Sequence, residues 1–170
     1  LGVLAACLTV LGVSKWQTQV TRPGPVPPLP KISAAQAYKF PEGGRKLFPA
    51  YRLVALYGSP QYPALGALGE QPLDATIARV QQLAAQYQPY STEHILPTLE
   101  IIASVASAYP TDNGDYSQET AVSELQPWVD AAQKAGVYVV LDLQPGRTDF
   151  LTQAKEFAPL LACPNVGLAL

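Results

Sequence analysis

Short apolar runs recur along the second part of the chain at the spacing expected for strands. The runs Arg52–Tyr57, Thr98–Val105 and Val137–Leu143 are almost wholly apolar and β-prone, and Val166–Leu170 is a shorter run of the same kind. Runs of this length without polar alternation are typical of strands buried on both faces. We therefore expect four strands in these segments.

Between these runs, apolar residues are spaced three and four positions apart, which predicts amphipathic helices. The first helix is expected over Leu73–Tyr87 and the second over Glu119–Ala135, with Gly136 as its stop. Pro127 lies inside the second helix and predicts a kink or a break into two helices, because proline lacks the backbone N–H.

A third helix is expected over Asp149–Leu161, with Thr148 as its N-cap and Asp149 favourable near the positive end of the helix. The elements then alternate strand and helix from the first strand to the last. This order predicts an α/β fold with a parallel sheet and right-handed crossovers.

Two parallel folds compete for this pattern: an open doubly wound sheet and a (β/α)8 barrel. The nucleotide-binding doubly wound fold needs a tight glycine-rich turn after the first strand, whereas Gly58–Gly69 is long and interrupted by prolines. A complete barrel takes about 250 residues. We therefore predict that residues 40–170 are the N-terminal half of a TIM-like (β/α)8 barrel, present as a truncated fragment.

The first residues predict export. Leu1–Val13 is an apolar run of signal-sequence length, too short for the roughly 20 residues of a membrane span. Leu4–Cys7 is similar to a lipobox, in which Cys7 would be lipidated, although the residues after Cys7 stay apolar. The alternatives for residues 1–14 are a signal or uncleaved anchor, a lipoprotein signal, or a buried helix.

Residues 15–39 are predicted to be a linker, because Pro23–Pro30 is proline-rich and favours an extended spacer. Position 1 is not Met, so we expect further sequence upstream. Together these features predict an extracytoplasmic protein of the cell envelope, held to the membrane by its N-terminal segment, or a secreted one.

The charge pattern argues against several classes of partner. The net charge is −2 and only 14% of residues are charged, with no basic stripe, so nucleic acid is not an expected partner. The single histidine, His94, excludes a histidine-rich metal site within the chain, and two cysteines cannot make a disulfide framework. We expect no metal and no cofactor.

Two carboxylates stand out because they lie within predicted buried strands. Strand alternation places Asp142 and Gln144 toward the barrel mouth, and Glu100 inward from the neighbouring strand. A buried carboxylate is costly unless it is paired. Paired inward carboxylates suit glycoside hydrolysis, as acid and ionised partner. The alternative is a structural network in which Arg52 or Arg147 neutralises them.

Further ligand-binding candidates lie at strand ends and in loops. Tyrosine, arginine, amide and carboxylate side chains together suit hydroxyl-rich ligands such as polysaccharides. The candidates are Tyr57, Glu70, Gln71, Asp115, Tyr116, Gln144 and Arg147.

Four segments carry a resemblance to a known family: Phe40–Arg45, Leu53–Gly58, Leu68–Gln71 and Val139–Arg147. From about residue 40 to 170 the chain resembles a family of exported bacterial proteins, many labelled lipoproteins, of uncharacterised function. The resemblance implies a barrel that continues past Leu170 into an acidic, Trp-containing segment. It implies no established activity and assigns no catalytic residue.

The sequence therefore predicts an envelope-associated TIM-barrel-like protein, with two hypotheses for its function. The first is a glycoside-hydrolase-like enzyme that uses Glu100 and Asp142 on surface polysaccharide. The second is a non-catalytic extracellular module that binds a ligand or partner through the same loops.

Overall fold

The structure is a computed structural model that describes residues 46–170. The predicted signal and linker segments, Cys7 and residues 40–45 lie outside this range. None of the helices it describes has the length and apolar character needed to cross a bilayer. The strands are β1 (Tyr51–Gly58), β2 (His94–Ala106), β3 (Ser117–Glu119), β4 (Tyr138–Leu143) and β5 (Val166–Ala169); the helices are α1 (Leu73–Tyr87), α2 (Val122–Lys134), α3 (Phe150–Glu156) and α4 (Ala158–Leu161), with 3-10 turns η1 (Pro63–Leu65), η2 (Ala67–Gly69) and η3 (Gln88–Tyr90).

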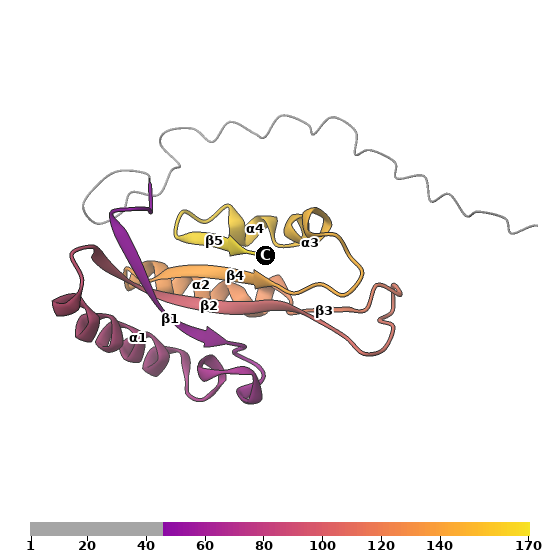
Figure 1. The fold of residues 1–170 in the computed structure, drawn as a ribbon. Coiled ribbons are helices and arrows are strands. Elements are labelled where there is room, and N and C mark those ends of the chain that lie inside the picture. Colours follow the sequence, from indigo (N-terminus) through magenta and orange to yellow (C-terminus); the bar gives the residue numbers. More distant parts are fainter. Residues whose placement is uncertain (1–45) are drawn as a thin grey trace, which may run out of the picture. The chain divides into compact units, whose positions relative to one another are not determined.

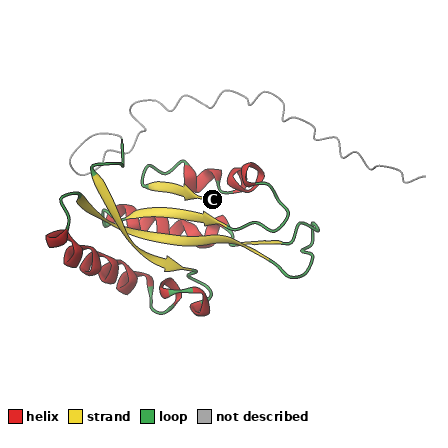
Figure 2. Cartoon of the chain, in the orientation of Figure 1, coloured by secondary structure: helices red, strands yellow, loops and turns green. Residues whose placement is uncertain are grey.

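The strands form one sheet in the order β1-β2-β4-β5, with these four strands parallel and β3 antiparallel beside β2 (Figures 1 and 2). The parallel strands therefore lie side by side in chain order, without a reversal among those described. Successive right-handed crossovers in one direction leave their helices on the same face of a sheet. The predicted α/β fold with a parallel sheet is confirmed at this level.

The helices bury one face of the sheet. Leu99, Ile101, Val139 and Leu141 are fully buried and alternate along β2 and β4 with residues of the opposite face. Aliphatic residues at helical spacing on α1, α2 and α4 pack against them in a single cluster, so this covered face is the core of the fold. The helix residues of the cluster include Ile77, Val80, Leu125, Val129, Ala132 and Leu160.

Strand β2 is longer than predicted, because it begins at His94 rather than Thr98. Pro97 lies in this extension, although proline cannot donate a hydrogen bond to a strand ladder. In the structure Pro97 pairs with Val54 of β1, and pairing with β4 begins only at Thr98. The proline is tolerated because this part of β2 has a single neighbouring strand.

The predicted helix over Glu119–Ala135 was wrong at its start. Glu119 ends β3, and the Thr120 amide donates to the Ala103 carbonyl at 2.8 Å, so the chain stays extended beside β2 until Ala121. The predicted break at Pro127 was also wrong, since α2 is one continuous helix. Pro127 lies in its second turn, where only the carbonyl of the first-turn residue Ser123 loses its donor.

The third predicted helix is divided in two. Its N-cap is Asp149 rather than Thr148: the Asp149 carboxylate accepts a hydrogen bond from the Thr152 amide at 3.0 Å. The helix breaks at Phe157, because Pro159 in the first turn of α4 cannot donate a backbone hydrogen bond to the end of α3.

Candidate functional site

The face of the sheet opposite the helices is called here the open face. Its amino end is closed by a small apolar cluster centred on Tyr51 and Leu96. Its carboxyl end is polar, because Tyr57, Glu100 and Asp142 lie there. The sequence prediction that Glu100 and Asp142 share one face agrees with the strand register, because Asp142 on β4 pairs with Ile102, two positions beyond Glu100. Tyr57, which the sequence placed only at the end of its strand, pairs with Glu100 and so lies on the same face.

Glu100 and Asp142 are therefore diagonal neighbours on adjacent parallel strands. Burial raises the pKa of Glu100, and the negative charge of Asp142 raises it further. Among the described residues, no cation pairs with Glu100 and no donor forms a hydrogen bond with it. This carboxyl group is consequently easier to protonate than a free glutamate.

The two arginines that could have neutralised these acids are engaged elsewhere. Arg52 pairs with Glu93 at 3.3 Å, at the opposite end of β1 from Tyr57. The Arg147 guanidinium carbon lies 3.9 Å from the ring centroid of Tyr116 in a cation–π contact. The structural-network alternative in its predicted form, with Arg52 or Arg147 as the partner, is therefore not what this fold contains.

Gln144, just beyond β4, connects the acidic pair to Tyr57. Its side-chain Nε2 donates to Asp142 Oδ2 at 2.7 Å and to the Tyr57 hydroxyl oxygen at 2.9 Å. Burial raises the pKa of Tyr57, the hydrogen bond from Gln144 lowers it, and the charges of Asp142 and Glu100 raise it again. Tyr57 remains 41% exposed, so it presents an aromatic surface beside two acids.

A buried polar chain behind the sheet holds Gln144 in place. The Gln144 backbone amide donates to Ser104 Oγ at 3.2 Å, and Ser104 Oγ donates to Gln153 Oε1 at 2.5 Å. Gln153 is fully buried on α3 and donates onward to Glu119 at 2.8 Å. A β-bulge between Ile102 and Ser104 makes this possible, because it turns Ser104 toward the helices.

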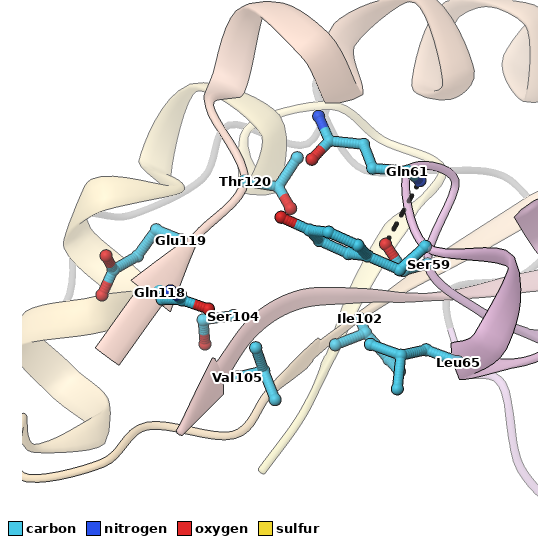
Figure 3. Close-up of a pocket in the computed structure, with 10 residues that line it drawn as sticks. Ser59, Gln61, Leu65, Ile102, Ser104, Val105, Gln118, Glu119 and Thr120 are labelled. Carbon is cyan, nitrogen blue, oxygen red and sulfur yellow. Dashed lines mark hydrogen bonds between the residues drawn. The ribbon is translucent and has the colours of Figure 1, made fainter. Parts of the chain in front are cut away.

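A small cavity opens at the carboxyl end of β2, between the β1–α1 loop and β3 (Figure 3). The loop is held down by a close approach between Gly58 and Gly66: a Cβ on Gly66 would lie 2.5 Å from the Tyr57 carbonyl oxygen. In Figure 3, Leu65 lies beside Ile102, and Thr120 and Ser59 come from opposite sides of the cavity. Ile102 thus belongs both to the cavity wall and to the open face.

Two of the predicted ligand-binding loops are tied to each other. The Asp115 carboxylate accepts hydrogen bonds from Thr111, the Ser117 amide and Thr148. These donors, with Thr111 and Thr148 first, lower its pKa to about 2. The Arg147 amide also donates to the Asp115 carbonyl at 2.7 Å. Both carboxylate oxygens of Asp115 thus accept hydrogen bonds from neighbouring loop residues.

Glu70 and Gln71 lie apart from this cluster, before α1. Glu70 pairs with Arg79 at 2.7 Å on the exposed side of the helix, and the Gln71 carbonyl accepts from the Thr76 hydroxyl at 3.3 Å. The structure brings Tyr57, Gln144 and the two acids together. Glu70 and Gln71 are not part of this cluster.

Sequence reasoning missed Ser104, Gln153 and Thr120. Gln153 carried a signal, because a glutamine on the apolar face of a helix needs a buried partner. Ser104 and Thr120 carried none, since their positions depend on the bulge and on the unexpected strand β3.

No protein family model, curated protein or solved structure matches the chain. Within residues 46–170, no group of three metal-ligating side chains could hold an ion. The open-face residues themselves are therefore the basis for assigning a function.

Proposed function

We propose that the chain is the front part of an exported, envelope-associated TIM-barrel-like protein of the family it resembles. The chain-order sheet with its helices on one face supports this proposal, because a barrel closes such a sheet around its open face. A doubly wound sheet would reverse its strand order instead. On this account the open face is the barrel interior, and Tyr57, Glu100 and Asp142 lie near its active end.

The proposed activity is hydrolysis of glycosidic bonds in surface polysaccharide. The observation that carries it is the pair Glu100 and Asp142, two charge-coupled acids on one face without a cation among the described residues. Glu100 is suited to be the general acid, because burial and the Asp142 charge favour its protonated form. Asp142 is the second acid of the pair, which stabilises the positive charge developing on the sugar ring.

The second candidate function is ligand binding without catalysis. Tyr57 favours it, since a half-exposed aromatic ring beside amide and carboxylate groups is a suitable platform for a sugar ring. Binding without hydrolysis would use the same residues for hydrogen bonds to hydroxyl groups. The membrane and the polysaccharide would then be its partners.

The test compares Glu100→Gln and Asp142→Asn in the full-length protein. If the pair is catalytic, release of reducing sugars from purified wall polysaccharide falls by about two orders of magnitude or more in each variant, while each variant still folds and unfolds cooperatively. Asp130→Asn is the matched control, because Asp130 lies exposed on α2 and, among the described residues, its carboxylate accepts a hydrogen bond only from Gln126. Full hydrolysis in either site variant removes that residue from the mechanism. Binding of the polysaccharide by the wild type without any hydrolysis favours the binding module.

A further inference from the structure

The cavity at the carboxyl end of β2 has the size of a very small chemical group. Its volume is about 30 Å³. A water molecule needs roughly 10–15 Å³ measured in this way, so two non-hydrogen atoms fit. A whole sugar ring does not fit, but a substituent of one can.

The lining of the cavity is apolar on one side and carries hydroxyl groups on the other (Figure 3). Leu65 and Ile102 supply the apolar wall. Thr120 is 9% exposed, and its hydroxyl group has no hydrogen bond to any residue within 46–170. Ser59 is 1% exposed, and its oxygen accepts from the Gln61 amide at 3.3 Å. An occupant with one carbon and one hydroxyl group would satisfy both sides.

The cavity adjoins the acidic pair. Ile102 is the register partner of Asp142 and lies two residues after Glu100 on the same face of β2. A sugar ring held at Glu100 and Asp142 therefore lies next to the cavity mouth. Tyr62 and Leu65 border it and are 52% and 38% exposed, so the mouth is open to solvent.

We propose that this cavity receives the exocyclic hydroxymethyl group of a hexopyranose. Its methylene carbon packs on Leu65 and Ile102, and its hydroxyl group bonds to Thr120 and Ser59. This subsite deepens the proposed function and rests on it, because the acidic pair places the ring. It selects hexose units with a free hydroxymethyl group over pentose units that lack one.

The test uses methyl β-D-glucopyranoside and methyl β-D-xylopyranoside, which differ only in the hydroxymethyl group. Each is titrated at millimolar concentration into the full-length protein, and the methyl NMR signals of Thr120, Ile102 and Leu65 are followed. The glucoside is expected to shift all three signals saturably, while the xyloside leaves Thr120 unmoved. In Thr120→Val the glucoside binds about three- to tenfold more weakly, the effect of one lost hydrogen bond.

Thr152→Val is the control, because Thr152 lies in the first turn of α3 and, within residues 46–170, its hydroxyl group forms a hydrogen bond only with Asp149. Equal shifts with both glycosides, no shift with either, or an unaltered glucoside affinity in Thr120→Val would each overturn the subsite. Wall hydrolysis is scored separately. If hydrolysis depends on Glu100 but the Thr120 signal does not shift selectively with the glucoside, only the subsite proposal is contradicted. If the signal shifts selectively but no hydrolysis occurs, only the enzymatic proposal is contradicted.

Discussion

The two faces of the sheet differ sharply although they are built from the same strands. On the covered face, Leu99, Ile101 and Leu141 are fully buried under the helices. On the open face, Glu100 and Asp142 alternate with them, and burial and mutual charge raise the pKa of Glu100. The covered residues account for folding, whereas the ionised form of Glu100 opposes it. A residue that lowers the stability of the folded protein at its position is a candidate for a functional role.

The largest expected effect lies on the covered face. Leu141→Ala should lower the free energy of unfolding by about 2–5 kcal/mol, because it leaves a cavity beneath the helices. Val140→Ala, one position away on the partly exposed open face, is the matched control and should cost well under half as much. Urea unfolding of the two variants measures both values. An equal loss of unfolding free energy in the two variants would mean that the covered and open faces are not different environments.

The next effect tests the polar chain that joins the two faces. Gln153→Met should cost about 1–3 kcal/mol, because Ser104 and Glu119 lose their buried partner. Loss of this support should also loosen Gln144 from Tyr57, so the pKa of Tyr57 rises above its wild-type value. Thermal unfolding and a tyrosine absorbance titration, referenced to Tyr57→Phe, measure the two consequences.

Gln81→Met is the control for this variant. Gln81 also donates its side-chain amide to a backbone carbonyl, that of Ala135 at 2.9 Å, but on an exposed surface. It should leave the Tyr57 pKa unchanged. A Gln153→Met variant that lost stability with an unaltered Tyr57 pKa would make Gln153 a folding residue only.

A smaller effect of opposite sign is expected for Glu100. Because its folded pKa lies above the ordinary 4.5, the wild type loses stability as pH rises from 4.5 through the folded pKa. Glu100→Gln should therefore be more stable than the wild type at pH 7, and the gain should vanish below pH 4.5. Urea unfolding across this pH range measures it. A variant less stable at pH 7 would contradict the account of the open face.

The smallest effect is confined to acid and concerns Asp115. Its folded pKa of about 2 lies below the ordinary 3.8, so its contribution to stability is present above pH 3.8 and is lost as pH falls toward 2. Asp115→Asn should flatten that part of the stability profile. Denaturation between pH 2 and 5 measures the difference from wild type, and identical slopes would remove Asp115 from the loop network.

The sequence predicted the parallel order and the alternation that places Glu100 and Asp142 on one face, because both follow from local apolar patterns. It did not predict β3, since Ser117–Glu119 carries no strand pattern and is held extended by pairing with β2. The cavity and the Ser104 contact were also beyond reach. The Ser104 contact depends on the register shift after Ile102, and β3 residues line the cavity; no local sequence pattern indicates either the shift or β3.

The most direct test is a carbon NMR titration of the Glu100 side-chain carboxyl group in the full-length wild type and in Asp142→Asn. The account predicts a Glu100 pKa above the ordinary 4.5 in the wild type and a lower one in Asp142→Asn, because the variant removes the neighbouring charge. A Glu100 pKa that is identical in the two proteins would show that the acids do not share a site.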